Sequence, residues 1–382
     1  MTATNDTQDE KEFIDWMENL GFELHPNLGF KNYGGSASRG VYAARGPIST
    51  GSVLFRQPDE SLLHPSSPHC IVSDILAGKL AKSDPFAALI TPLFWSSAEL
   101  EELKGTEVME QLGRDEIEAT YHQRIEPLVK ANPIVFTTED CSMGGTLEDF
   151  LECGSIVMSR AFDAGPKGVP AMTPMADMLN HRTGLCNAHL ISDDVAGHAP
   201  SFVAINDIPK GGELINTYGD HSNAELLRRY GFTEENNPYD TVDLSAELLD
   251  DGSGDALKRL RRINAPISFT LKASGRVPLS LLRAAKLCAI PAEEYKAIRP
   301  GQIASHLGEI SSDTIGSAAW AVVSRAVAKR LMQYATQTND DDEELLKHPD
   351  NLPINRLNAI RVRFGEKKIL IKLLKHARKY TQ

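Results

Sequence analysis

The segment spanning residues 213–232, which reads ELINTYGDHSNAELLRRYGF, most constrains how this chain can fold. A Pro-Lys-Gly-Gly turn at 209–212 precedes it, and the spacing of residues 213–218 is typical of a strand that the next glycine ends. Ser222 and Glu225 have the spacing of a capping box, and a glycine follows the apolar face of the predicted helix. The segment therefore predicts a strand, a sharp turn, a short helix and an aromatic exit.

A second informative segment, residues 175–181, reads MADMLNH. Strand signals return at residues 201–205 and again at 213, so this segment is expected in irregular structure between sheet elements. Taken alone, an Asn-His pair such as Asn180-His181 is more often a loop cap than a ligand site. The pair becomes informative because it precedes the segment 213–232 in the chain.

The length of 382 residues exceeds the size of about 250–300 residues at which single cores usually stop growing. We therefore predict two domains, residues 1–237 and residues 238–382. A helical insertion at about 65–158 is expected to split the first domain, because short strand-like pieces at 30–58 give way there to helical spacing.

Three helix predictions lie in the second domain. Residues 281–285 and the alanine-rich stretch 318–334 each form an apolar stripe at helical spacing. Residues 357–380 form a third stripe, which Gly365 is expected to interrupt or bend. The acidic stretch 339–344 is interpreted as a solvated connecting loop.

Composition excludes several classes of protein. Hydrophobic residues make up 41% of the chain and charged residues 24%, which argues against extended disorder. The formal net charge of -12 disfavours binding to a phosphate backbone and would attract a basic protein segment. We therefore expect no direct contact with nucleic acid.

The cysteines and the hydropathy pattern bear on the compartment. The five cysteines are scattered and contain no C-x-x-C pair, so they are interpreted as reduced thiols. The first residues lack a basic start with an apolar core, and no run of 18 apolar residues occurs. The sequence predicts a protein of the cytoplasm, the nucleus or both, without a membrane segment.

Four ordered motifs together resemble a known family. ADMLNH followed by NTYGDHSNAELLRRYGF is similar to the paired signature of SET-domain protein lysine methyltransferases, whose two segments tuck past one another in a pseudoknot, a threading that is rare in folds. SASRGVYAARGPISTGSVLFRQP at 36–58 and SRAF at 159–162 are further matches. The resemblance is to the subgroup with an interrupted SET domain, which includes plant Rubisco large-subunit methyltransferase and, most similar here, fungal ribosomal-protein lysine methyltransferases.

This resemblance implies an α+β fold class: a β-rich, pseudoknotted SET-type catalytic domain with a helical insertion, followed by an all-helical C-terminal domain that docks substrate. It also implies a cofactor, S-adenosyl-L-methionine. The implied function is protein-lysine N-methyltransferase, with a lysine-bearing protein as partner and a basic ribosomal protein as one candidate. The protein is expected to be a monomer.

The family motifs assign site residues by position. Tyr218 is the implied catalytic residue, and Arg160, Tyr218 and Tyr230 are the implied substrate contacts. The implied cofactor contacts are Ala37, Ser38, Arg39, Arg160, Asp177, Asn180, His181, Tyr218 and Phe232. Asn180 and His181 would act through side-chain amide and backbone hydrogen bonds.

Methyl transfer from a sulfonium needs a neutral amine in line with the methyl carbon and the sulfur. A lysine with an ordinary pKa of about 10.4 must lose its proton first, and a narrow aromatic channel lowers that barrier by desolvating the ammonium. A phenol with a pKa of about 10 is a poor general base near neutral pH. Tyr218 is therefore expected to orient groups and to supply electrostatic stabilisation.

Two departures from the family pattern stand out. A small residue and Arg39 occupy positions where glycine or leucine is common, and Ala164 stands where some relatives carry a second arginine after SRAF. The outer substrate contacts are therefore left open. Histidine in place of lysine as the methyl acceptor also stays open, as does a non-catalytic binding module derived from a SET domain.

Metal and phosphate sites are disfavoured. His181, Cys186 and His189 are loosely spaced like metal ligands, but no fourth partner follows at zinc-type spacing, so no metal is expected. The glycine run at 34–40 has neither a GK[ST] ending nor a dinucleotide fingerprint in the required setting. Cofactor binding therefore depends on the SET resemblance.

Overall fold

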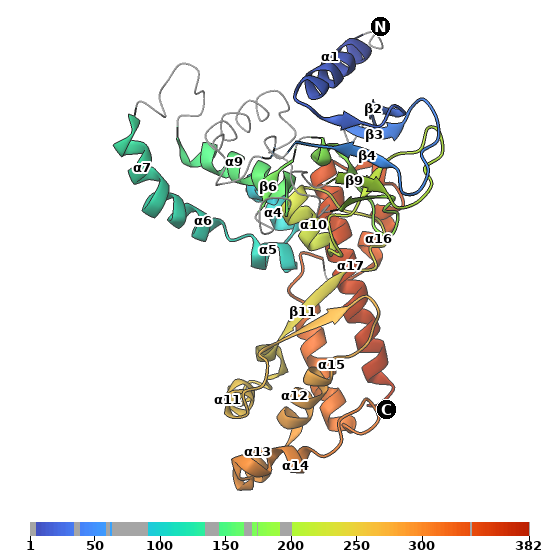
Figure 1. The fold of residues 1–382 in the computed structure, drawn as a ribbon. Helices are drawn as coiled ribbons and strands as arrows, with labels where there is room; N and C mark the ends of the chain where they lie inside the picture. Colours follow the sequence, from blue (N-terminus) through green and yellow to red (C-terminus); the bar gives the residue numbers. More distant parts are fainter. Residues whose placement is uncertain are drawn as a thin grey trace. The chain divides into compact units, whose positions relative to one another are not determined.

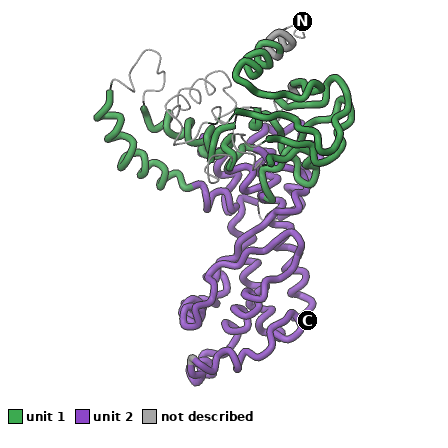
Figure 2. Tube along the Cα trace, in the orientation of Figure 1, with its two compact units in different colours: residues 1–93, 113–220, 229–231 green, residues 94–112, 221–228, 232–382 purple. Residues whose placement is uncertain are grey.

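The chain forms two compact units that interleave along the sequence (Figure 2). The computed structural model describes residues 5–33, 39–58, 62, 91–133, 145–163, 170–173, 175–191, 201–336 and 338–381. The first unit comprises Met1–Leu93, Gly113–Asp220 and Arg229–Gly231, and the second comprises Phe94–Leu112, His221–Arg228 and Phe232–Gln382. The expected domains 1–237 and 238–382 stay a prediction.

The first unit is built on a four-stranded antiparallel sheet with the order β1-β4-β9-β8 (Figure 1). Its strands are β1 Glu23–Leu24, β4 Val53–Arg56, β8 Ala188–Ile191 and β9 Ser201–Ala204. A separate antiparallel pair joins β2, Leu28–Asn32, to β3, Arg39–Ala43. The short strands expected at residues 30–58 are thus confirmed, and they belong to two antiparallel sheets.

Aromatic packing stabilises the larger sheet. Phe55 on β4 and Phe202 on β9 are both fully buried, and their rings stack with centroids 4.7 Å apart. Phe162 packs edge-on against Phe202 at 6.1 Å. Because burying one such side chain contributes about 1.5–3 kcal/mol, these rings fix the sheet on which the short site strands depend.

The helices of the first unit begin where the sequence supplies caps. The helix α9, Leu147–Arg160, starts at Thr146, whose hydroxyl accepts from the Asp149 N–H while the Asp149 carboxylate accepts from the Thr146 N–H. This reciprocal cap fixes the start of α9, which ends at Arg160. Other helices among the described residues of this unit include α1 Asn5–Asn19, α6 Arg114–Thr120, the π-helical turn η3 Tyr121–Ile125 and α7 Glu126–Ala131.

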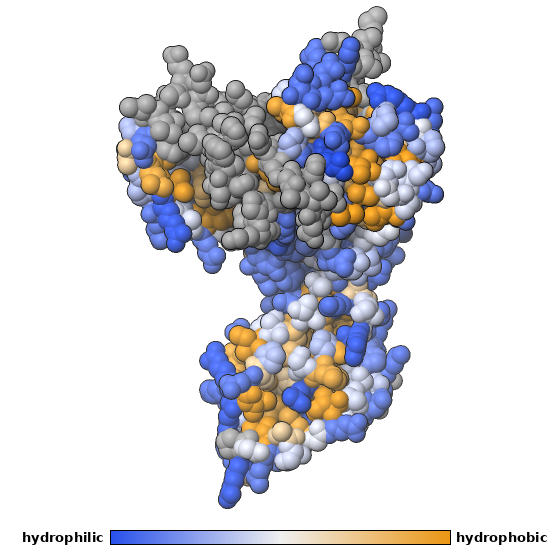
Figure 3. All heavy atoms as spheres, in the orientation of Figure 1, coloured by the Kyte–Doolittle hydropathy of each residue, from blue (hydrophilic) through white to orange (hydrophobic). Residues whose placement is uncertain are grey.

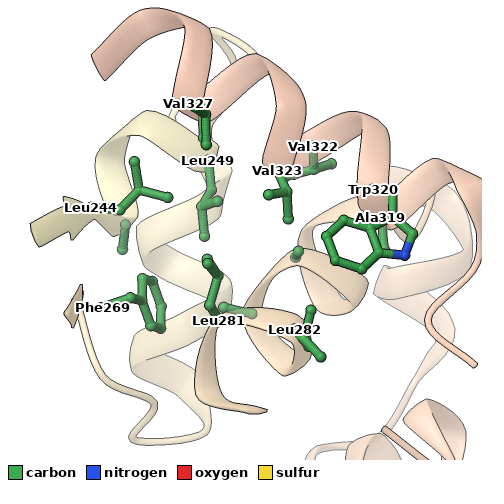
Figure 4. Packing of buried hydrophobic residues seen from close by; sticks show 14 of the residues in the cluster. Leu244, Leu249, Phe269, Leu281, Leu282, Ala319, Trp320, Val322, Val323 and Val327 are labelled. Atoms are coloured by element: carbon green, nitrogen blue, oxygen red, sulfur yellow. The ribbon is translucent and has the colours of Figure 1, made fainter. Parts of the chain in front are cut away.

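Helices dominate the second unit, and many of them surround a large hydrophobic core. Figure 4 shows Trp320 of α15 beside Leu282 of α12, with Leu244 of β11, Thr241–Ser245, farther away in the same cluster. Trp320 is fully buried, so its replacement by alanine would cost about 3–5 kcal/mol. The main helices are α4 Ser97–Glu102, α5 Glu107–Gln111, α10 Asn223–Tyr230, α11 Asp255–Arg262, α12 Leu279–Ala289, α13 Ala292–Ala297, α14 Ile303–Leu307, α15 Ser317–Leu331, α16 Asp340–Leu346 and α17 Ile354–Arg378.

The structure corrects three details predicted for residues 238–382. The region is not purely helical, because β11, Thr241–Ser245, pairs antiparallel with β12, Ser268–Lys272. The helix α17 runs through Gly365 without interruption. A Cβ at Gly365 would lie only 2.3 Å from Oδ2 of Asp240, so this glycine allows close packing and does not end the helix.

The acidic stretch at 339–344 is also not a solvated loop. Most of it forms α16, and Asp342 in that helix is fully buried. Its carboxylate lies 2.7 Å from the guanidinium of Arg363 and 2.6 Å from the ammonium of Lys367, both on α17. The charge pattern misled because the partners are more than 20 residues away along the chain.

Within the part of the chain that the structure describes, no helix is long and apolar enough to cross a membrane. Figure 3 shows hydrophobic residues among hydrophilic ones on the visible surface of both units. The exposed large hydrophobic residues of the second unit include Ile267, Leu279 and Met332.

Candidate functional site

Two short strands bring the informative sequence segments together. The strand β7, Asn180–His181, pairs in parallel with β10, Ile215–Asn216, so that Asn180 lies opposite Ile215 and His181 opposite Asn216. Two residues beyond β10 lies Tyr218. The first unit therefore places the Asn-His pair and the motif tyrosine in direct contact, although 37 residues separate His181 from Tyr218.

Tyr218 is held at both ends. Its backbone N–H donates to Nδ1 of His181 at 3.0 Å, and its hydroxyl donates to the carbonyl of Leu179 at 3.0 Å. Its ring stacks on the His181 ring, with centroids 5.1 Å apart, and lies 4.7 Å from the ring of Tyr230. The structure thus brings together Tyr218 and Tyr230, two of the three predicted substrate contacts.

The surroundings of Tyr218 keep its phenol neutral. Burial raises the pKa of Tyr218 well above its ordinary value, the carboxylate of Asp177 raises it further, and the guanidinium of Arg160 acts in the opposite direction. A neutral phenol that donates to a carbonyl oxygen still has lone pairs available to accept. The group suits orientation and not proton abstraction, as the sequence predicts.

His181 acts as a brace for the tyrosine. Because Nδ1 accepts the Tyr218 N–H, the ring proton is assigned to Nε2, which lies 3.2 Å from the hydroxyl of Thr183. The His181 side chain is buried, and its ring nitrogens face these two partners. A cofactor contact from His181 would therefore come from its backbone, and that contact stays a prediction.

Asn180 has a defined amide orientation. Its Nδ2 donates to the carbonyl of Arg39 at 3.1 Å and to Oε1 of Glu213 at 2.7 Å. Both amide hydrogens are then used, which leaves Oδ1 to accept from another group. Gly40 makes this arrangement possible, because a Cβ there would lie 2.7 Å from Nδ2 of Asn180.

Arg160 and Asp177 form an ion pair beside this cluster. The guanidinium at the end of α9 lies 2.9 Å from the Asp177 carboxylate, and both side chains are about one quarter exposed. Asp177 lies in the 3-10 turn η5, Ala176–Met178, just before β7. The pair braces Asp177 against α9, and the predicted cofactor contacts of Asp177 and Arg160 and the substrate contact of Arg160 stay predictions.

The remaining predicted residues are distributed differently. Arg39 begins β3, where its carbonyl binds Asn180 and its side chain is exposed. Ala37, Ser38 and the departure at Ala164 lie outside the described residues. Phe232 belongs to the second unit, so its role as a wall of the cofactor site stays a prediction.

His181, Cys186 and His189, whose spacing is loosely like that of metal ligands, have separate partners or none in common within the described part of the chain. The Cys186 thiol lies 3.2 Å from the carbonyl of Ala188, and His189 is exposed on β8. Among the residues that the structure describes, no group of three or more His, Cys, Asp or Glu side chains is arranged to hold a metal ion.

Sequence reasoning missed two residues of the cluster, Glu213 and Asn187. Asn187 donates from Nδ2 to the Glu213 carbonyl at 2.9 Å and accepts at Oδ1 from the Ile215 N–H at 2.8 Å. Its own N–H donates to the Ile215 carbonyl at 2.9 Å. No local pattern marks either residue, because each acts through partners about 25 to 35 positions away.

Comparison with known proteins finds relatives that are named as lysine methyltransferases. Residues 255–370 match the family model described as Rubisco LSMT substrate-binding. N-lysine methyltransferase SETD6 of Bos taurus is 27% identical over 440 residues, covering 96% of this chain and 94% of that protein. Ribosomal lysine N-methyltransferase 4 of Saccharomyces cerevisiae is 32% identical over 163 residues, covering 37% of this chain and 32% of that protein.

Solved structures share the fold along almost the whole chain. Rubisco LSMT bound to sinefungin and monomethyllysine superposes with a TM-score of 0.74 at 21% identity, covering 97% of this chain and 91% of that one. The SET domain of LSMT bound to lysine and AdoHcy gives a TM-score of 0.71 at 20% identity, covering 98% and 91%. The predicted α+β fold class is confirmed, and the chain is similar in sequence to N-lysine methyltransferases and in fold to Rubisco LSMT.

Proposed function

We propose that this protein is an S-adenosylmethionine-dependent protein-lysine N-methyltransferase. The observation that carries the proposal is the fixed geometry of Tyr218, whose backbone is held by His181 of the Asn-His motif and whose neutral hydroxyl is aligned by the Leu179 carbonyl. The relatives named above are lysine methyltransferases, and the solved structures hold cofactor analogues with lysine or monomethyllysine.

The residues present fit the proposed cofactor. Oδ1 of Asn180 is an acceptor without a partner among the described residues, which suits the ammonium of an amino acid moiety. S-adenosylmethionine supplies a methyl group on a positively charged sulfur. The neutral Tyr218 hydroxyl, already donating to a carbonyl, can accept weakly from polarised C–H groups or from an amine N–H.

The chain's own residues then account for positioning. Tyr218 and Tyr230 pack against each other with ring centroids 4.7 Å apart and so form one aromatic wall, which suits the apolar stem of a lysine and disfavours the hydrated ammonium. His181 and Leu179 hold the tyrosine so that its dipole needs no reorganisation during the reaction. Catalysis in this scheme comes from orientation and not from a side-chain base.

We propose that the substrate is a lysine-bearing protein, with a basic ribosomal protein as the first candidate. The net charge of -12 favours a basic partner, and one of the relatives is named as a ribosomal lysine methyltransferase. The match of residues 255–370 to a substrate-binding family supports docking on the second unit. We propose that the protein acts as a monomer in the cytoplasm or the nucleus, and the free thiols of Cys153, Cys186 and Cys288 are consistent with such a reducing compartment.

The test is incubation of the purified protein with isotopically labelled S-adenosylmethionine and a ribosomal protein fraction, followed by mass spectrometry that maps each labelled residue. The proposal expects label on lysine. Label found only on histidine would show that histidine, and not lysine, accepts the methyl group. Calorimetry without substrate separates the remaining alternative, because a non-catalytic module should fail to bind the cofactor; a folded protein that binds the cofactor and labels nothing would contradict the proposal.

A further inference from the structure

Glu213 places a carboxylate at the centre of the site cluster, and none of the predicted roles uses it. Its side chain is only 13% exposed, and Oε1 accepts from Nδ2 of Asn180 at 2.7 Å. Oε2 lies 3.9 Å from the guanidinium of Arg182, which is the outer limit of an ion pair. Arg182 is the one cation within that distance among the described residues, and its own side chain is 57% exposed, so water screens this attraction.

The other charges near Tyr218 largely compensate one another. Arg160 and Asp177 lie 2.9 Å apart, and they act in opposite directions on the pKa of Tyr218, with Asp177 raising it and Arg160 lowering it after the larger effect of burial. Glu213 raises the same pKa by a smaller amount. The carboxylate of Glu213 therefore acts on Tyr218 in the same direction as Asp177, and its nearest cation is the exposed Arg182.

The carboxylate of Glu213 also affects a second tyrosine, Tyr33. Burial first, and the Glu213 carboxylate second, raise the pKa of Tyr33 to about 12. Tyr33 and Glu213 both lie against Gly40, where a Cβ would come within 2.7 Å of the tyrosine ring and 2.9 Å of Oε1. Two phenols on different segments, Tyr33 and Tyr218, thus both experience the negative charge of Glu213.

We propose that Glu213 is a charge-matching residue, which makes the site bind the cationic cofactor in preference to the neutral product of methyl transfer. The inference rests on the proposed function and deepens it. S-adenosylmethionine and S-adenosylhomocysteine differ by one methyl group and by one positive charge on sulfur. A partly desolvated carboxylate attracts the sulfonium and has no such effect on the thioether, so loss of the methyl group weakens binding and favours product release.

Two variants separate charge from shape. Glu213→Gln removes the negative charge but keeps a carbonyl oxygen that can accept from Asn180 Nδ2. Arg182→Gln removes the distant counter-ion and leaves Glu213 more negative in effect. Glu23→Gln is the matched control, because Glu23 is a carboxylate of the same unit whose side chain is 68% exposed and pairs with Arg56.

The measurement is calorimetric binding of S-adenosylmethionine, S-adenosylhomocysteine and sinefungin, whose amine replaces the sulfonium, to each variant with its fold checked by circular dichroism. Glu213→Gln is expected to weaken the binding of S-adenosylmethionine relative to that of S-adenosylhomocysteine by about tenfold, as judged by the ratio of their dissociation constants. The affinity for sinefungin is expected to change in the same way as the affinity for S-adenosylmethionine. Arg182→Gln is expected to shift the ratio in the opposite direction, and Glu23→Gln to leave it unchanged.

Equal weakening of all three ligands by Glu213→Gln would show that Glu213 only holds Asn180, and would overturn the inference. A ratio unchanged in both Glu213→Gln and Arg182→Gln would overturn it as well. If Glu213→Gln does not fold, the sign of the Arg182→Gln shift decides. Failure of the wild-type protein to bind any of the three ligands would instead overturn the proposed function, and the inference with it.

Discussion

Hydrogen bonds hold Tyr218 and Asn180 in place and still leave each side chain an oxygen that can accept a further hydrogen bond. Tyr218 donates its proton to the Leu179 carbonyl and keeps its acceptor capacity, and Asn180 uses both amide hydrogens and keeps Oδ1. Because burial, and then the charge of Asp177, raise the pKa of Tyr218, the phenol stays protonated over the usual assay range. The pH dependence of turnover should therefore not report this tyrosine.

Tyr218→Phe should lower kcat by about a hundredfold, because it removes one preorganised dipole at the reacting centre. The affinity for S-adenosylhomocysteine should change by less than about threefold, since the ring contacts with His181 and Tyr230 are retained. Steady-state kinetics and calorimetry measure the two quantities. Unchanged kcat in a folded variant would remove Tyr218 from its proposed role.

Gly40→Ala should weaken cofactor binding, because the added Cβ would stand 2.7 Å from Nδ2 of Asn180 and displace the amide. Gly154→Ala is the control, since a Cβ at that helical position meets nothing within 4 Å. Calorimetry should show a loss of at least about tenfold for the first variant and none for the second. Equal affinity in both variants would show that the orientation of Asn180 does not matter.

The sequence predicts some of these residues and not others for a physical reason. Asn180, His181 and Tyr218 stand in motifs with a recognisable order, and the structure brings them into contact. Glu213 and Asn187 act through space on backbone or amide groups, and their residue types are ordinary for a strand end or a loop. Only the folded chain reveals which partners they meet.

At the scale of elements, β10 is a two-residue strand that depends on support from both sides. One side pairs with β7 in parallel. On the other side, the side-chain amide of Asn187 forms the hydrogen bonds that a neighbouring strand would form. Its Nδ2 donates to the Glu213 carbonyl, and its Oδ1 accepts from the Ile215 N–H. So short a strand gains little from its own pairing, and the position of Tyr218 depends on these flanking bonds.

Asn187→Ala should loosen β10, because it leaves a part-buried carbonyl and a part-buried N–H without partners at a cost of about 1–3 kcal/mol. Hydrogen exchange should show faster exchange of the Ile215 amide. Asn206→Ala is the control, since Asn206 bonds only the exposed neighbouring carbonyl of Cys186 at 3.2 Å. Exchange at Ile215 that is the same in both variants would show that Asn187 does not support the strand.

Elements with local signals are the ones that the sequence predicts correctly. The hydroxyl of Ser222 accepts from the Glu225 N–H at 3.3 Å and α10 begins at the next residue, as expected, because this cap involves residues three positions apart. Strands of two residues carry no periodicity, so β7 and β10 have no boundaries in the sequence. The helix α16 was mistaken for a loop because Asp342 is stabilised by Arg363 and Lys367 from a distant helix.

At the scale of the whole molecule, the second unit buries an unusual amount of charge. Besides the Asp342 cluster, Glu366 is 2% exposed, accepts from the Tyr334 hydroxyl at 2.7 Å, and has a pKa that burial raises well above its ordinary value. Asp240 is likewise buried, and burial raises its pKa to about 6, although the Asn223 N–H bonds its carboxylate at 2.8 Å. Stability should therefore depend on pH.

The effect of Asp240 on the pH dependence of stability follows from the pKa values of its carboxyl group in the unfolded and folded states. The unfolded carboxyl ionises near 3.8 and the folded one near 6, so the folded state binds more protons between these values and loses stability as pH rises through that window. The loss amounts to about 3 kcal/mol. Asp240→Asn should remove it, making the variant more stable than the wild type at pH 8 and nearly equal to it at pH 4.

Thermal unfolding at both pH values checks this prediction. Asp251→Asn serves as the control of opposite sign, because the hydroxyl and the N–H of Ser253 lower the pKa of that exposed carboxyl and its replacement should not stabilise the protein at pH 8. A wild type and an Asp240→Asn variant with parallel pH profiles would contradict the burial argument.

The most direct test of the central claim is a crystal structure of the protein with S-adenosylhomocysteine and a lysine peptide. We expect the ligand amino group within hydrogen-bonding distance of Oδ1 of Asn180, and the lysine amine and the sulfur on either side of the Tyr218 hydroxyl. A cofactor bound away from β7 and β10, or a lysine that enters without approaching Tyr218, would contradict it.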